Sequence, residues 1–169
     1  MKNHRLLFVL FFFCFAIILS SAAMAQKASP AATATGKIGA ANIEIAYSSP
    51  AVKDRKIWGS LVPYDKVWRA GADEATTFTT DRDLMVEGKK LPAGTYSFFV
   101  IPTDDEWVII FNNVASQWGA YKYNAEEDAL RAEVKPVRTD KKQERLQYTI
   151  EKDGFNLIWD NLKIPVSVK

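Results

Sequence analysis

Apolar and polar residues alternate with a period of two along much of the chain beyond residue 40. Ile43, Ile45 and Tyr47 are separated by Glu44 and Ala46, a pattern typical of a half-buried β-strand. Segments rich in β-branched and aromatic residues predict further strands over 75–80, 84–86, 95–101, 107–111, 146–150, 155–159 and 162–168. The pattern therefore predicts eight or nine short strands.

Turn residues connect these strands into hairpins. Glu87-Gly88-Lys89 supplies a glycine where a positive φ is needed, and residues 102–106 join two strongly β-prone segments. Asp153-Gly154 reverses the chain near the end, and Pro165 favours an edge position for the last strand. Closely spaced turns of this kind are typical of antiparallel sheets.

One short helix is predicted, from Asn124 or Ala125 to about Leu130, with Asn124 as the N-cap and acidic residues in the first turn. Short strands separated by a turn about every 8 to 12 residues predict an all-β fold, an antiparallel β-sandwich or jelly roll. A closed β-barrel is the alternative, since the pattern of one sequence does not distinguish the two.

The first 25 residues have the pattern of a signal peptide. Lys2 and Arg5 precede an apolar run over residues 6–19, and Ala23-Met24-Ala25 forms an A-x-A cleavage site. The apolar run is shorter than the roughly 20 residues that span a membrane. We therefore expect cleavage after Ala25, a periplasmic or extracellular protein, and no membrane anchor after cleavage.

Composition divides the rest of the chain into two parts. Residues 26–36 are rich in Ala, Ser, Thr and Pro, which predicts a flexible lead-in. Residues 37–169 have no internal repeat, and their length suits a single β-sandwich domain.

Cleavage also limits the chemistry that the protein can perform. His4 and Cys14 are the only histidine and cysteine, so their removal excludes a Cys/His zinc site, a Ser-His-Asp triad and a cysteine nucleophile. Loss of Lys2 and Arg5 from 22 basic residues leaves 20 against 20 acidic ones, a net charge of zero. Nothing in this balance favours nucleic acid as a partner. A metal could be held only by oxygen ligands, as calcium or magnesium is, and no calcium-loop motif is present. We predict no cofactor and assign no metal-binding residue.

Five tryptophans follow the predicted signal peptide. Trp107 and Trp159 occupy alternating positions of predicted strands and are expected in the core. Trp58, Trp68 and Trp118 lie beside Gly or Arg in less regular segments. Each of these three could close one end of the sandwich or line a cleft, where an exposed aromatic face stacks on sugar rings or cations.

Two adjacent carboxylates, Asp73 and Glu74, follow Arg69 in a glycine-containing loop. In a strand they would point to opposite faces, whereas in a loop they could serve one substrate. Alternatively, one turns the backbone while the other pairs with Arg69. The candidate ligand-binding residues are Trp68, Arg69, Glu74 and Trp118, followed by Asp73, Tyr47, Arg55 and Tyr121.

Ser49 and Lys53 are the nearest approach to a Ser-Lys catalytic pair. Their spacing is S-x-x-x-K, not the S-x-x-K of known pairs, and Ser49 before Pro50 favours a helix N-cap. No catalytic residue is therefore assigned.

Several segments together resemble one known family: residues 47–50, 53–59, 61–64, 67–76, 91–96 and 118–120, with Asp128 and Arg131. They resemble the exported bacterial family catalogued as domain of unknown function 2911, and the Trp-Arg-x-Gly-Ala block at 68–72 is the most specific part. Asp54 and Asp73 stand where this family is expected to have Gly and Asn. The resemblance implies export and implies no activity.

We predict a non-catalytic domain that binds a small molecule, with a glycan as the class that suits its aromatic residues. A hydrolase or lyase is the first alternative, with Asp73 or Glu74 as base and Arg69 or Lys53 stabilising an anion. A structural or envelope-assembly partner that binds protein through a sheet edge is the second.

Overall fold

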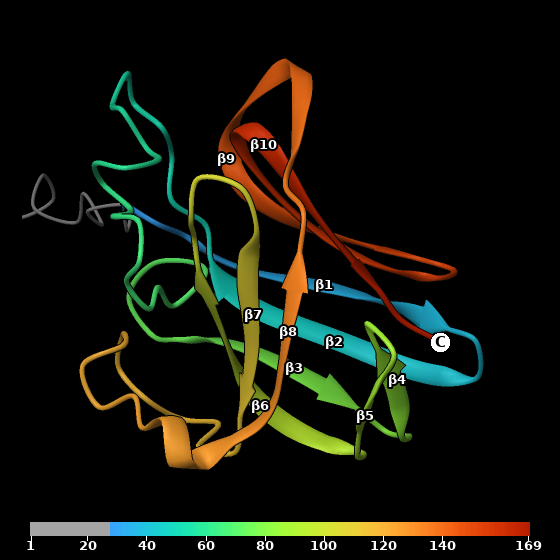
Figure 1. Ribbon diagram of the computed structural model, residues 1–169. Helices are drawn as coiled ribbons and strands as arrows, with labels where there is room; N and C mark the ends of the chain where they lie inside the picture. Colours follow the sequence, from blue (N-terminus) through green and yellow to red (C-terminus); the bar gives the residue numbers. More distant parts are fainter. Residues whose placement is uncertain (1–27) are drawn as a thin grey trace, which may run out of the picture.

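Six antiparallel strands form the main sheet, in the order β1-β2-β3-β6-β7-β8 (Figure 1). The computed structural model describes residues 28–169, and the predicted signal peptide lies outside this range. The strands of the main sheet are β1 (Ala31–Ile38), β2 (Ala41–Ser48), β3 (Thr76–Thr80), β6 (Gly94–Ile101), β7 (Trp107–Asn112) and β8 (Asp128–Val134).

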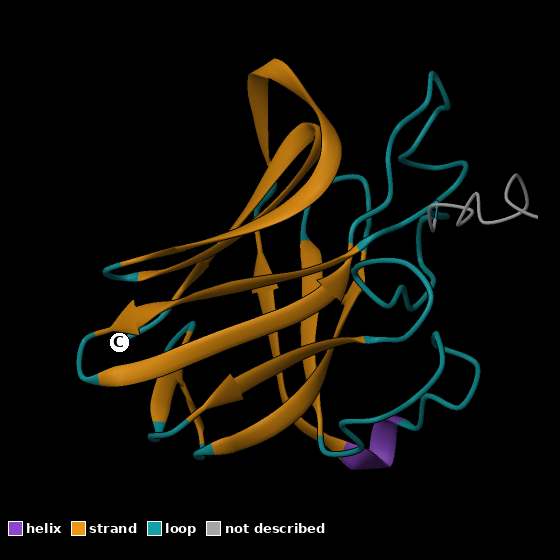
Figure 2. Cartoon of the chain, turned by 180° about the vertical axis from the view of Figure 1, so that it is seen from behind, coloured by secondary structure: helices purple, strands orange, loops and turns teal. Residues whose placement is uncertain are grey.

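Two hairpins lie outside this sheet. The long strands β9 (Val137–Glu151) and β10 (Gly154–Ser167) pair with each other, and β4 (Leu84–Val86) pairs with β5 (Lys89–Leu91). The amide of Met85 donates to the carbonyl of Lys169 over 2.8 Å, which ties β4 to the end of β10. Among residues 28–169 no sheet closes into a barrel, and the predicted antiparallel β-sandwich is confirmed (Figure 2).

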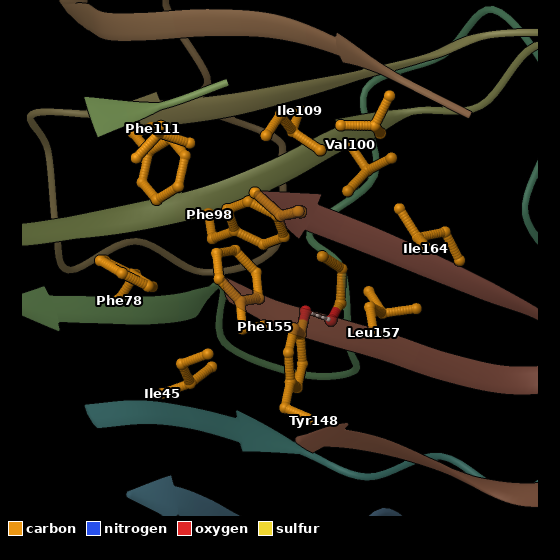
Figure 3. Close-up of a cluster of buried hydrophobic side chains, with 14 of the residues drawn as sticks. Ile45, Phe78, Phe98, Val100, Ile109, Phe111, Tyr148, Phe155, Leu157 and Ile164 are labelled. Atoms are coloured by element: carbon orange, nitrogen blue, oxygen red, sulfur yellow. Dashed lines mark hydrogen bonds between the residues drawn. The ribbon is translucent and has the colours of Figure 1, made fainter. Parts of the chain in front are cut away.

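The core lies between one face of the main sheet and the β9–β10 hairpin. Phe98 of β6 packs edge-on against Phe155 of β10 at 5.6 Å between ring centroids, and Phe78 of β3 lies 5.3 Å from the same ring. Tyr148 of β9 completes the cluster 6.3 Å from Phe98 (Figure 3). Aromatic pairs at these distances bury large apolar areas and stabilise the sandwich.

A smaller apolar cluster covers the opposite face of the main sheet. Phe99 and Ile110 are fully buried there and pack with Ala75, Val67 and Tyr123. These contacts bury β6 on both faces, because loops before β3 and before β8 cover the outer side. The outer loops therefore rest on a hydrophobic base, which positions the candidate site.

The β4–β5 turn confirms the prediction at Glu87-Gly88. Both residues have a positive φ, 47° and 77°, as a two-residue hairpin turn that matches strand twist requires. Pro165 also lies as predicted, in the last part of β10, where the ladder with β9 has ended at Lys163.

The predicted flexible lead-in is wrong for residues 31–36, which belong to β1. This strand pairs with β2 along its whole length, from Ala31 opposite Ser48 to Ile38 opposite Ala41. Its small side chains gave little hydrophobic contrast in the sequence. They allow close packing instead: a Cβ added at Gly36 would lie 2.9 Å from Ile150 of β9.

The predicted helix is also much shorter than expected. Asn124 is the N-cap, and its Oδ1 accepts from the Glu126 amide at 3.1 Å, but the element is a 3₁₀ turn that ends at Glu127. Residues 128–134 form β8 because they pair with β7, and this pairing outweighs the helix propensity of their Ala, Leu and Glu residues.

Two further predictions on strand ends need correction. The predicted strands 155–159 and 162–168 are one strand, β10, with register shifts around Asp160, where φ is 52°. Ser49 does not cap a helix; its hydroxyl donates to the carbonyl of Leu146 at 2.7 Å and fastens the end of β2 to β9. Within residues 28–169, none of the helical structure is long and apolar enough to cross a membrane.

Candidate functional site

The predicted site residues border two cavities, not one. Glu74, Trp118 and Tyr121 line a cavity of about 620 Å³ over the outer face of the main sheet, which we call the outer groove. A second cavity of about 390 Å³, which we call the cationic cavity, is lined by four other predicted residues: Arg55, Trp68, Arg69 and Asp73. Tyr47 lines neither of them.

The adjacent carboxylates separate because residues 73–75 run antiparallel to residues 117–119. Glu74 forms a β-bridge with Trp118, and the amide of Gly119 donates to the carbonyl of Asp73 at 3.1 Å. Neighbouring residues in strand-like pairing point to opposite sides. Asp73 consequently borders the cationic cavity and Glu74 the outer groove.

Two exposed aromatic residues border the outer groove. The side chain of Trp118 is 59% exposed and that of Tyr121 is 83% exposed. Thr77, Ser116, Gln117 and Lys122 supply polar groups along the same wall. An apolar ring beside hydroxyl, amide and carboxylate groups is suited to a ligand that has both apolar faces and polar edges.

A polar network holds the loop that carries these residues. Gln117 Nε2 donates to Ser97 Oγ at 3.0 Å and to the carbonyl of Val114 at 2.9 Å. Gln117 also lies 3.3 Å from Asn112 Oδ1. Its own Oε1 is buried and has no hydrogen-bond partner among residues 28–169. The amide of Gln117 is thus fixed inside the loop by these hydrogen bonds.

A second polar network anchors the end of the same loop. The hydroxyl of Tyr123 and the Nε of Arg131 both donate to Asp128 Oδ2, each at 2.6 Å. Burial, with the hydrogen bond to Asp128, raises the pKa of Tyr123, so the hydroxyl remains a donor at neutral pH. The loop before β8 is therefore held at both ends by buried or half-buried hydrogen bonds.

The cationic cavity is built on a short pairing of Trp68 with Val100 of β6. Their backbones exchange two hydrogen bonds of 2.8 and 2.9 Å, and the Trp68 indole donates to the carbonyl of Gly71 at 3.2 Å. The Trp68 ring stacks on Trp159 at 5.9 Å with an interplanar angle of 17°. A rigid aromatic wall results.

Charged residues occupy the rest of that cavity wall. Arg55 donates from Nε to the carbonyl of Val52 at 3.0 Å and from a terminal nitrogen to that of Ala51 at 2.5 Å. Arg69 has a buried Nε that has no hydrogen-bond partner within the described residues. Lys53 also lines the cavity. Three cations and the carboxylate of Asp73 therefore face one space.

Ala70 fixes the turn between the two cavities in an unfavourable backbone conformation. Its φ is 53°, and it is fully buried. Its carbonyl accepts hydrogen bonds from the Tyr148 hydroxyl at 2.8 Å and from Thr76 Oγ1 at 3.0 Å. Left-handed alanine costs about 1–2 kcal/mol, so these two hydrogen bonds hold a strained residue in place.

The remaining aromatic predictions divide between core and site. Trp107 and Trp159 are 1% exposed, which confirms their prediction as core residues. Trp58 is buried in the core, 4.8 Å from Trp107 and 5.7 Å from Trp68 between ring centroids. Tyr47 packs edge-on against Tyr148 at 4.8 Å and belongs to the packing of β9 on the main sheet.

Gln117 and Trp159 are two of the lining residues that sequence reasoning did not include among the candidates. Gln117 lies in a polar loop without a recognisable motif, and the only sequence signal for it is its position next to Trp118. Trp159 was assigned to the core by its alternation, yet it also lines the cationic cavity. Among residues 28–169, no group of three or more Asp, Glu, His or Cys residues is placed to hold a metal ion.

Comparison with known families agrees with the motifs at this site. The model of the family described as "Protein of unknown function (DUF2911)" matches residues 29–168. No curated protein and no solved structure matches the chain significantly. The family match spans both cavities and the whole sandwich, so the chain belongs to the DUF2911 family.

Proposed function

We propose that this protein is an exported, non-catalytic domain that binds carbohydrate in the outer groove. Trp118 carries the proposal, because it combines high exposure with a fixed backbone. A flexible exposed tryptophan would lose conformational entropy on binding, whereas the bridge to Glu74 has already ordered the backbone of Trp118.

The distribution of exposed apolar residues supports this location. Six large hydrophobic side chains are exposed within residues 28–169, and three of them, Val114, Trp118 and Tyr121, line the outer groove. Apolar groups gathered around one concavity favour a binding site, whereas single exposed ones are ordinary. A cavity of about 620 Å³ also suits a small ligand.

The polar wall of the groove matches the hydrogen-bonding pattern of sugars. Sugar hydroxyls both donate and accept, and the groove is lined by Glu74, Thr77, Ser116 and Gln117, whose side chains all carry oxygen atoms. Stacking on Trp118 would supply the apolar contact.

A glycan array followed by titration calorimetry tests the proposal. We expect Trp118→Ala to weaken binding of the best glycan about tenfold, because a stacked ring contributes about 0.5–1.5 kcal/mol beyond its buried area. Met85→Ala is the matched control, since Met85 is also exposed but lies on β4 outside the groove. Equal affinities of Trp118→Ala and the unmodified protein would contradict the proposal.

Export is tested separately by the mass of the protein. We expect the protein recovered from a periplasmic extract or culture medium to begin at Gln26, because Ala23 and Ala25 are the small residues that signal peptidase reads. Intact mass spectrometry measures this directly. A mass that retains residues 6–19 would contradict it.

A further inference from the structure

We propose that the cationic cavity binds a small organic carboxylate. This inference goes beyond carbohydrate binding and is independent of it, because the cationic cavity and the outer groove have no lining residue in common. It is carried by hydrogen-bond donors that the described residues leave unpaired.

Two residues of the cavity wall have buried donors without partners within residues 28–169. They are the Nε of Arg69 and the indole Nε1 of Trp159. Trp159 is 1% exposed, so bulk water does not satisfy its N–H group. Buried polar atoms in native proteins are nearly always hydrogen-bonded, so each exception requires an explanation.

The chemistry of the unpaired groups identifies the kind of partner. Guanidinium and indole groups donate and do not accept. The missing partner must therefore present acceptor oxygens. A carboxylate suits Arg69 well, because the planar guanidinium matches its two oxygens in a bidentate arrangement.

The charges around the cavity favour an anion over a neutral acceptor. Lys53, Arg55 and Arg69 contribute three positive charges and Asp73 one negative charge, a local balance of +2. Gly119 leaves space for the guanidinium, since a Cβ there would lie 3.1 Å from Arg69 Nη1. The cavity lining thus carries a net positive charge, with the Arg69 guanidinium held beside Gly119, and this charge attracts anions.

The other walls indicate an organic ligand and not an inorganic ion. Leu61, Val62, Trp68, Pro50 and Ala51 present apolar surface to the same cavity of about 390 Å³. Phosphate or sulfate would gain nothing from these residues, whereas a hydrocarbon or aromatic body attached to a carboxylate would be removed from water.

Nitrogen-15 NMR of the exported protein tests the proposal at the two unpaired donors. Benzoate is the probe, benzamide is its neutral counterpart, and inorganic phosphate is the inorganic anion. We expect benzoate to give saturable downfield shifts of the Trp159 indole and Arg69 Nε–H signals, with slower hydrogen exchange. Benzamide should leave both signals unchanged, and phosphate should bind at least tenfold more weakly.

Two variants locate the site and remain informative if one fails to fold. Arg69→Lys keeps the charge but loses the fork of donors, so we expect at least a tenfold weaker affinity for benzoate. Lys53→Gln alters an exposed residue of the wall and should weaken binding several-fold. Met85→Ala should bind benzoate as the unmodified protein does.

Several outcomes would overturn the proposal. One is the absence of a benzoate shift up to about 10 mM, a concentration at which even a weak millimolar site is occupied. Another is an equal response to benzamide, which would indicate apolar binding alone, or to phosphate, which would indicate a site for any anion. A benzoate shift confined to the Trp118 indole would place binding in the outer groove and would also overturn the proposal. The carbohydrate proposal can fail without any effect on the benzoate response of Trp159 and Arg69, so the two failures are distinguishable.

Discussion

Replacement of Tyr148 by phenylalanine tests how the sandwich supports the strained turn beside Arg69. The Tyr148 hydroxyl donates to the carbonyl of Ala70 at 2.8 Å in a fully buried setting. In Tyr148→Phe this carbonyl keeps its hydrogen bond from Thr76 Oγ1, so no acceptor is left unpaired. We therefore expect a loss of about 1 kcal/mol in the free energy of unfolding at pH 7, the value of one net hydrogen bond.

The pH dependence of stability gives the same substitution a second signature. Burial raises the pKa of Tyr148 well above its ordinary value of 10.0. The folded state therefore keeps the proton at a pH where the unfolded chain releases it. The stability that the buried neutral phenol contributes is complete below pH 10, and it falls by about 1.4 kcal/mol per pH unit above pH 10 until the folded-state pKa is reached.

The lost hydrogen bond makes Tyr148→Phe less stable at pH 7, whereas ionisation of Tyr148 on unfolding lowers the stability of the unmodified protein alone above pH 10. The free energies of unfolding of the two proteins should therefore become equal at some alkaline pH. A deficit of about 1 kcal/mol at pH 7 is cancelled when the unmodified protein has lost the same amount, at about pH 11. Urea melts followed by tryptophan fluorescence at pH 7, 9, 10 and 11 measure the crossing. Other groups that titrate near pH 10 affect both proteins equally and cancel in the difference.

Tyr121→Phe is the matched control at pH 7, since Tyr121 is 83% exposed and the loss of its hydroxyl should leave the urea midpoint unchanged there. The reasoning would be refuted if Tyr148→Phe were destabilised equally at pH 7 and pH 11. That result would mean that the phenol of Tyr148 ionises in the folded protein as easily as in water.

Three further substitutions follow from the backbone and the polar networks. Asp54→Gly should raise stability by about 1 kcal/mol in urea melts, because Asp54 has a φ of 55° that glycine adopts freely; a loss would show that the aspartate side chain matters more. Gly119→Ala should lower the thermal midpoint and shift the Arg69 Nε–H NMR signal, because φ is +62° and a Cβ would lie 3.1 Å from Arg69 Nη1; an unchanged signal would argue against that contact. Asp128→Asn should cost about 1–2 kcal/mol by weakening two charge-assisted hydrogen bonds, whereas Asp83→Asn, which alters an exposed ion pair, should leave the urea midpoint unchanged.

The strands that the sequence predicts are those in which one face is hydrophobic and the other polar. β2 shows this contrast, with Ile43 and Ile45 buried and Glu44 exposed. β1 was missed because alanine and threonine alternate there, and both suit a half-buried edge. β8 was read partly as helix because its residues favour helix locally, and only the distant partner β7 makes it a strand. Long-range pairing is not visible in a local pattern.

The sequence singled out residues of the candidate site but not their arrangement. The sequence identified Arg69, Asp73, Glu74 and Trp118 as a group, and all of them border cavities. Their division into two sites depends on the pairing of residues 73–75 with 117–119, which lie more than 40 positions apart in the chain. The lack of a hydrogen-bond partner for the Trp159 indole within residues 28–169 could not be predicted either, since alternation predicts that a side chain is buried but not which atom its N–H group meets.

Two residues of this turn have a strained backbone conformation. Ala70 and Asp73 both have a positive φ, 53° and 58°, and neither is glycine. Such residues persist only where their surroundings over-determine the backbone. Tyr148 and Thr76 hold the Ala70 carbonyl, and Gly119 donates to that of Asp73, so each strained residue is fixed by hydrogen bonds from another part of the fold. A relaxed loop would not need this support. The hydrogen bonds that hold these two residues therefore also fix the backbone at the boundary between the two cavities.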